Sequence, residues 1–141
     1  MNDTRKKPVG LTEKAGWQIG LRRTIAVPHK FLWDVLVSSN GLNIWLGDHA
    51  TLKLVKGAKY QLKDGTYGEV KVFHPESHLR ITRKPLDSDY DRPSTIQVRV
   101  VDKGEKSVLV FHEENLPNQK ERYARKEYYS GVVEQIKSLV S

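Results

Sequence analysis

The chain has 141 residues, with 24 Lys and Arg against 17 Asp and Glu and no Cys. That length is typical of a single domain, and the lack of Cys excludes a thiol nucleophile, a Cys-ligated zinc site and an iron–sulfur cluster. The hydrophobic share of 38% and the charged share of 29% are typical of a folded globular protein rather than a disordered one.

Residues 1–15 are predicted to be a flexible basic segment that precedes one domain over residues 16–141. A basic tail can bind nucleic acid through its phosphates. The cluster Arg5-Lys6-Lys7 is short, however, and no nucleic-acid-binding signature accompanies it. We therefore interpret this segment as a solvated tail and expect no specific nucleic-acid partner.

No stretch of the sequence approaches the ~18–20 consecutive apolar residues of a membrane span. Residues 1–10 are charged and lack the apolar run of a signal peptide. The sequence thus predicts no membrane span and favours a cytoplasmic location.

The first regular element is predicted over residues 17–27, where apolar and polar residues alternate with a period of two, as in a strand with one buried face. Pro28 ends that strand and suits the first turn of a helix. Apolar residues at helical spacing over residues 31–36 predict this helix. A second short helix is predicted over residues 42–46, closed by Gly47.

A run of strands is predicted next, at residues 52–54, 60–62, 66–73, 79–83, 96–100 and 107–112. Asp64-Gly65 suits a tight hairpin turn, because Gly accepts the positive φ that such turns require. The segment 84–93 holds two Pro and three Asp and is predicted to be a loop. This spacing is typical of a curved antiparallel sheet, here of about six strands.

Residues 118–140 are predicted to form one long helix with Asn118 as its N-cap. Residues at helical spacing form a stripe along one face of this helix, and in the first half of the helix the stripe passes through Arg122 and Arg125. In the second half it is apolar and comprises Tyr129, Val132, Val133, Ile136, Leu139 and Val140. Gly131 interrupts this helix at a cost of ~1 kcal/mol relative to Ala, and we expect it to allow close approach to the sheet.

The long helix is the only predicted element able to cover the apolar face of the sheet, which must be buried. The sequence therefore predicts an α+β fold in which a curved antiparallel sheet wraps around the C-terminal helix. Two short helices follow the first strand. Such an arrangement tends to leave a cavity between the sheet and the helix.

Motifs for catalysis or metal binding are absent from the sequence: there is no nucleophile elbow, zinc-protease helix, phosphate-binding loop or dinucleotide fingerprint. His74 and His78 are four residues apart, but Pro75 and a turn separate them, so they do not form a helical ligand pair. We predict no catalytic residue, no metal site and no cofactor.

Arg83 has the strand parity of Leu79 and Ile81, which predicts an inward-facing side chain. A buried Arg must be paired. Its partner is either a Glu of the sixth strand or a ligand carboxylate held bidentately. Alternatively, Arg83 lies at a strand end and extends its head to water.

His112 has the strand parity of Val108 and Val110, so it faces inward if they do. One interpretation is a hydrogen-bonded histidine at the end of a strand. The other is a polar group that orients a ligand in the cavity. Aromatic side chains are expected to line the same pocket or to fill the core. The candidate ligand-binding residues are Trp45, Tyr60, Tyr67, Val70, Ile81, Arg83, Val98, Val110, His112, Tyr129 and Val133.

The stretch P-H-K-F-L-W-D-V-L-V, followed by G-L-N-I-W-L-G, resembles the opening of START-like SRPBCC proteins. More narrowly, it resembles the family named for the C-terminal domain of the activator of heat-shock-protein-90 ATPase. The resemblance covers about residues 17–140. It continues in Asp64-Gly65, Gly68-Glu69-Val70, Pro75 and Leu79, and then in His112, Leu116-Pro117 and Gly131. One departure is Val132, where the family often has Trp.

The resemblance implies the helix-grip fold. Members of this family include ligand-binding proteins, stress-related proteins and cyclase- or hydrolase-like relatives. Our leading hypothesis is non-enzymatic binding of a small hydrophobic ligand (a lipid, polyketide or aromatic compound) between sheet and helix. The alternatives are an interaction module that partners a heat-shock ATPase through its basic surface, and an enzyme using His112 as general base with Arg83 as electrostatic stabiliser.

Overall fold

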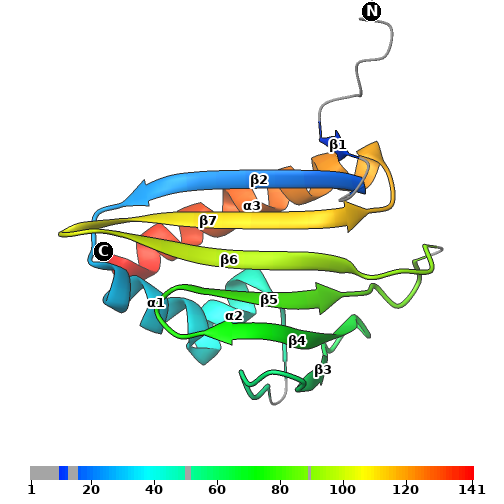
Figure 1. Ribbon diagram of the computed structural model, residues 1–141, viewed down its shortest axis with the longest axis horizontal. Coiled ribbons are helices and arrows are strands. Elements are labelled where there is room, and N and C mark those ends of the chain that lie inside the picture. The colour runs from blue at the N-terminus through cyan, green and yellow to red at the C-terminus, as the bar shows by residue number, and fades with distance from the viewer. Residues whose placement is uncertain (1–9, 13–15, 50–51, 89) are drawn as a thin grey trace, which may run out of the picture.

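The computed structural model describes residues 10–12, 16–49, 52–88 and 90–141. All neighbouring strands of its sheet run antiparallel, in the order β1-β2-β7-β6-β5-β4-β3 (Figure 1). The elements in chain order are β1 (Leu11–Thr12), β2 (Gly16–Ile25), α1 (His29–Val37), α2 (Ser39–Trp45), β3 (Lys59–Gln61), β4 (Tyr67–His74), β5 (His78–Arg83), β6 (Ser94–Lys103), β7 (Lys106–Leu116) and α3 (Gln119–Val140).

The predicted fold class is confirmed, with two differences in the strands. Residues 52–54, expected to be a strand, are irregular. Leu11 and Thr12 form a short strand that pairs with Trp17 and Gly16 of β2, which brings the sheet to seven strands. Residues 1–9 and 13–15 of the expected flexible segment lie outside the described residues, and the domain boundary at residue 16 stays a prediction.

Helix α3 begins where the sequence places its cap. The Asn118 side chain accepts a hydrogen bond from the Glu121 amide at 2.8 Å, which satisfies one of the free N–H groups of the first turn. The apolar stripe of α3 meets the inner face of the sheet: Tyr129, Val133 and Ile136 are each at most 1% exposed. The helix therefore closes the core, as predicted.

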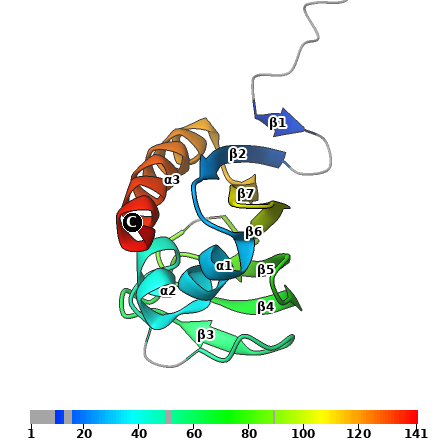
Figure 2. The same ribbon diagram turned by 90° about the vertical axis from the view of Figure 1, so that its left-hand side faces the viewer.

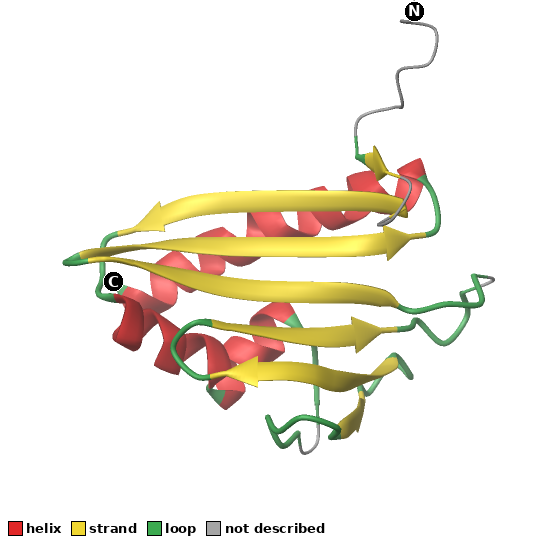
Figure 3. Cartoon of the chain, in the orientation of Figure 1, coloured by secondary structure: helices red, strands yellow, loops and turns green. Residues whose placement is uncertain are grey.

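All three helices lie on one side of the sheet (Figures 2 and 3), and the described part of the chain places no element over the other side. The hydrophobic core fills the space between the inner face and the helices. Among the helices that the structure describes, none combines the length and the apolarity needed to cross a membrane.

Side chains of β6 and β7 alternate between the two faces. The buried positions of β7 include Leu109, Phe111 and Glu113, and Phe111 lies opposite the buried Val98 of β6. The intervening residues Val110 and His112 lie opposite Arg99 and Gln97, on the outer face. This parity decides which side chains reach the space beneath α3.

Gly131 does not approach the sheet, contrary to expectation. It lies on the exposed side of α3, and a Cβ built on it would have no neighbour within 4 Å. Because Ala restricts the unfolded chain and has the higher helix propensity, Gly131→Ala should stabilise the protein by about 0.5–1 kcal/mol. Urea unfolding of the variant measures this gain. An unchanged or lower midpoint would contradict the exposed placement.

Candidate functional site

A buried carboxylate stands at the centre of the interface between β7 and α3. Glu113 is fully buried and accepts hydrogen bonds from Arg83 Nε at 2.8 Å and from Arg125 Nε at 2.7 Å. The Tyr129 hydroxyl donates to the same oxygen as Arg125, at 2.7 Å, and the Ser94 hydroxyl donates to the other oxygen. We call these five residues the Glu113 cluster.

The Glu113 cluster carries a surplus of positive charge. Burial alone would raise the pKa of Glu113, but Arg125 and Arg83 together with the Ser94 and Tyr129 hydroxyls lower it to about 2. The carboxylate is therefore ionised at neutral pH and faces two guanidinium groups, each on a side chain that is only 12% exposed. One positive charge in the cluster has no counterpart within it.

Neither guanidinium is saturated by the protein. Within the described residues, the Arg83 side chain donates only through Nε, and both of its terminal nitrogens lack a hydrogen-bond partner. Arg125 donates through Nε and, at 3.0 Å, from Nη2 to the Tyr129 hydroxyl. These free N–H donors can bind an anion that enters from outside.

Tyr128 fixes the position of Arg125 and links α3 to α2. The Arg125 guanidinium lies over the Tyr128 ring, 4.2 Å from its centroid, a geometry favourable for a cation–π interaction. The Tyr128 hydroxyl is within hydrogen-bond distance of the carbonyls of Trp45, at 2.8 Å, and Ile44, at 3.1 Å. The end of α2 is thereby held against α3.

Beside this contact a cleft of about 440 Å³ opens toward solvent; we call it cleft A. Both guanidinium-bearing side chains of the Glu113 cluster, Arg83 and Arg125, line it. The other lining residues are Leu46, Gly47, Asp48, Leu62, Lys63, Asp64, Thr66 and Tyr128. Cleft A therefore combines apolar walls with the two arginines of the Glu113 cluster, and Lys63, Asp48 and Asp64 add further charges to its lining.

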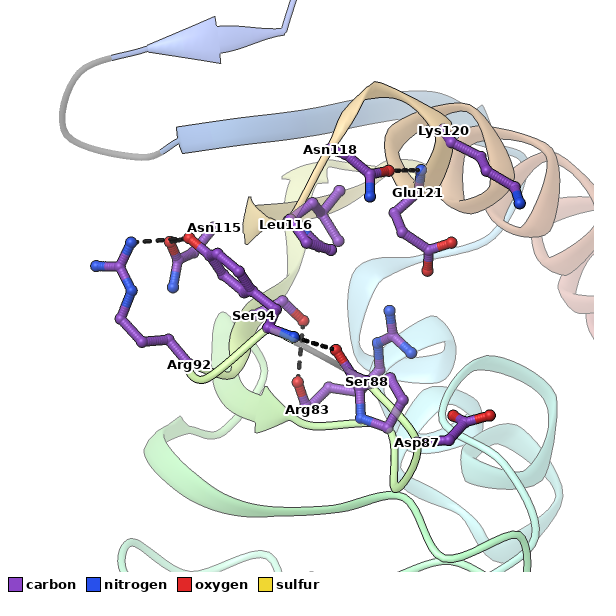
Figure 4. Close-up of a pocket in the computed structure, with 13 residues that line it drawn as sticks. Arg83, Asp87, Ser88, Arg92, Ser94, Asn115, Leu116, Asn118, Lys120 and Glu121 are labelled. Carbon is purple, nitrogen blue, oxygen red and sulfur yellow. Dashed lines mark hydrogen bonds between the residues drawn. The ribbon is translucent and has the colours of Figure 1, made fainter.

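A second cleft, cleft B, lies on the other side of Arg83 and has a volume of about 420 Å³. Its walls come from the loop between β5 and β6, the end of β7 and the first turn of α3. Figure 4 shows the Arg83 and Glu121 side chains pointing into it, with Asp87 nearby. Cleft A also contains two carboxylates, Asp48 and Asp64, but it alone of the two clefts is lined by both arginines of the Glu113 cluster.

The structure buries seven of the predicted ligand-binding residues in the core. Each is at most 5% exposed, and Tyr129 stacks on Phe111 with ring centroids 5.0 Å apart. The seven are Trp45, Tyr60, Val70, Ile81, Val98, Tyr129 and Val133. Packed side chains thus occupy the region beneath α3 where the sequence led us to expect a cavity. Arg83 alone of the predicted set lines cleft A or cleft B.

The prediction that Val110 and His112 face the inside of the sheet is wrong. Both lie on the outer face of the sheet, because Leu109, Phe111 and Glu113 occupy the inner positions of β7. His112 Nε2 is 2.7 Å from Gln18 Oε1, which agrees with the interpretation of a hydrogen-bonded strand histidine.

Tyr67, also in the predicted set, is 47% exposed and lines neither cleft A nor cleft B.

The enzyme alternative paired His112 with Arg83. The sheet separates these two side chains, so they do not form one catalytic site. In the part of the chain that the structure describes, no three His, Asp or Glu side chains gather as metal ligands.

The predicted set of ligand-binding residues lacks Ser94, Glu113, Arg125 and Tyr128. A Glu of the strand predicted at residues 107–112 was one of the partners considered for Arg83, and Glu113, in the corresponding strand β7, is that partner. One feature of the sequence indicates this buried site: Arg125 lies on the stripe of α3, one turn before Tyr129. A cation on a buried stripe requires a buried anion, and Glu113 meets that requirement.

The fold is that of the START-like helix-grip proteins. The chain belongs to the family described as Activator of Hsp90 ATPase homolog 1-like protein, whose model matches residues 26–141. No curated protein sequence matches the chain.

Three solved structures illustrate the shared fold. CalU16 from Micromonospora echinospora is 16% identical, with a TM-score of 0.69 over 86% of this chain and 76% of that chain. An Hsp90 activator from Plasmodium falciparum is 16% identical, with a TM-score of 0.72 over 87% and 95% of the two chains. A protein from Chromobacterium violaceum is 15% identical, with a TM-score of 0.75 over 87% and 96%. At these identities the likeness shows the fold alone.

Proposed function

We propose that the protein binds a small amphipathic acid in cleft A without transforming it. The ligand is a lipid, a polyketide or an aromatic compound that ends in a carboxylate or a similar anion. The observation that carries this proposal is the Glu113 cluster, in which two guanidinium groups share one carboxylate and both line an open cleft. Within the Glu113 cluster one guanidinium has no counter-charge, and an incoming anion would supply it beside the Asp48 and Asp64 carboxylates that also line cleft A.

The two guanidinium groups suit the acidic end of such a ligand. Arg83 keeps both terminal nitrogens available, and a planar guanidinium fork matches the geometry of a carboxylate. Arg125 is held in place by Glu113, Tyr129 and the Tyr128 ring, so little side-chain freedom is lost when it meets a ligand. The site is preorganised for one anionic group.

The rest of cleft A suits an apolar body. Leu46, Leu62 and Tyr128 supply apolar surface, and the volume of about 440 Å³ lies within the ~300–1,000 Å³ range of small-molecule sites. The ligand therefore occupies a cleft at the margin of the core, rather than a cavity through its middle.

Matched pairs of ligands test the proposal on the unmodified protein. Fatty acids and aromatic acids should bind about 10- to 150-fold more tightly than their uncharged amides, because a hydrogen bond to a charged group contributes ~1.5–3 kcal/mol. Isothermal titration calorimetry measures both members of each pair. Equal affinity of acid and amide would contradict the role of the guanidinium groups.

Two further measurements locate the bound ligand. Methyl NMR signals of Leu46 and Leu62 in cleft A should shift on titration, whereas those of Val110 on the outer face should not. Arg83→Lys keeps the charge but removes the planar fork, and it should weaken the acid more than the amide. If no acid perturbs the Leu46 and Leu62 methyl groups, the proposal fails.

A second function, partnership with a heat-shock ATPase, is favoured by the family and by its Hsp90-activator neighbour from Plasmodium falciparum. Purified protein should then bind an Hsp90-type ATPase and raise its rate of ATP hydrolysis. A coupled ATPase assay with and without the protein separates this function from ligand binding. We place both functions in the cytoplasm, which imaging of a fluorescent fusion tests.

A further inference from the structure

The outer face of the sheet carries a hollow of about 380 Å³ that has no relation to cleft A. Its lining includes Val110 and His112, whose face of the sheet points away from the three helices, all of which lie on the other side of the sheet (Figure 2). Three arginines from three strands line it: Arg22 of β2, Arg80 of β5 and Arg99 of β6. We call this the outer hollow.

Strand register brings the three arginines to one surface. Val110 of β7 lies opposite Arg22 on the neighbouring strand β2 and opposite Arg99 on the neighbouring strand β6. The two arginines therefore stand in one row across β2, β7 and β6. Arg80 pairs with Gln97 in a neighbouring row. Arg80 Nε donates to Gln97 Oε1 at 2.8 Å, which positions this guanidinium and leaves its terminal nitrogens available.

Positive charge dominates the outer hollow. Within the described residues, none of its three arginines forms an ion pair, and Glu114 is the only acidic residue in its lining. The neighbouring His78 responds to this field: its pKa is lowered by burial first, and then by Arg99, His74 and Arg80. A face with unpaired arginines attracts an anionic partner.

We propose that the outer hollow binds an acidic segment of a partner protein, a short run of Asp and Glu side chains. Strands lie ~4.8 Å apart, so the backbones of Arg22 and Arg99, two strands apart, are separated by about 10 Å. Several carboxylates spaced along one chain reach both arginines, whereas one small anion does not fill the row.

The composition of the outer hollow argues against single-stranded nucleic acid. Binding of that kind relies on aromatic side chains on which bases stack. No aromatic side chain other than His112 lines the outer hollow, and His112 is hydrogen-bonded to Gln18. Complementarity of charge alone, without stacking, is what an acidic peptide requires.

A labelled peptide tests the proposal on the full chain. The probe is a fluorescein-tagged run of six Glu between Gly-Ser linkers, and the same peptide with Gln is its neutral counterpart. Fluorescence polarisation should show binding of the Glu peptide alone at about 50 mM salt, and weakening at about 300 mM. Arg99→Gln and Arg22→Gln should each lower the affinity about fivefold.

Arg23→Gln is the matched control. Arg23 follows Arg22 on β2, is exposed and pairs with the inward-facing Leu109, so this variant loses the same charge on the other side of the strand. It should lower the affinity by less than twofold. An equal loss in Arg22→Gln and Arg23→Gln, or no binding of the Glu peptide, overturns the proposal. So does tighter binding of inorganic phosphate or single-stranded DNA that depends on Arg99.

Discussion

Replacing Glu113 with Gln should destabilise the protein by about 3–5 kcal/mol, because two buried guanidinium groups then lose their counter-charge. Gln keeps the shape of the side chain, so the loss reports on charge rather than on a cavity. The free energy of unfolding, measured in urea near neutral pH, gives the effect. Tyr129 and Ser94 donate to different oxygens of Glu113, and Gln has a single amide oxygen, so one of the two hydroxyls also loses its acceptor and adds to the loss.

Glu114→Gln is the control for this prediction. Glu114 is the next residue on β7 and lines the outer hollow. Among the described residues it forms no ion pair. This variant should change the free energy of unfolding by no more than ~0.5 kcal/mol. If Glu113→Gln were as mild as Glu114→Gln, the central role of the buried carboxylate would be wrong.

Acid should remove the difference between Glu113→Gln and the wild-type protein. The pKa of Glu113 is lowered to about 2 in the folded state, below its ordinary value of ~4.3. The stabilisation is therefore fully present above pH ~4.5 and is lost as the pH falls toward 2. Urea unfolding at pH 6, 4 and 3 should show the two proteins converging. A constant difference would contradict ionisation of Glu113.

Replacing Ile136 with Asp should cost at least ~4 kcal/mol, because it removes a buried apolar side chain and inserts an unpaired charge. Ile136 is fully buried on the stripe of α3 that covers the sheet. Thermal unfolding followed by circular dichroism should show a melting temperature lowered by well over 10 °C, or a chain that no longer folds.

Gln135→Asp provides the comparison on the same turn of α3. Gln135 is exposed, so Asp there meets water and should cost less than ~1 kcal/mol, chiefly through helix propensity. Similar melting temperatures for Ile136→Asp and Gln135→Asp would show that this face of α3 does not pack on the sheet.

The helices were predictable because their signals are local. Asn118 begins α3 and the 3.6-residue stripe selects its buried face, so both followed from spacing alone. Strand β7 was harder, because apolar residues occupy both of its faces: Val108 and Val110 outside, Leu109 and Phe111 inside. A period-two pattern does not choose between two apolar sets.

The candidate site depended on that choice. Carboxylates ordinarily face water. By that expectation the residues that share the parity of Glu113 would have been assigned to the outer face of the sheet. It faces inward because Arg83 and Arg125, 30 residues before it and 12 after it, meet there. Long-range pairing of this kind leaves no periodic signal. Arg83 was placed on the correct face because only one parity of β5 is apolar, at Leu79 and Ile81.

The contact between Tyr128 and the end of α2 also determines when during synthesis cleft A becomes complete. Tyr128 and Trp45 are 83 residues apart in the sequence. A chain emerging from the ribosome at ~5–20 residues per second therefore exposes the walls at Leu46 and Leu62 for several seconds before Tyr128 and Arg125 are available. During that interval cleft A is incomplete, so a ligand that binds there, as proposed, would act only on the finished polypeptide and not on the folding of its first half.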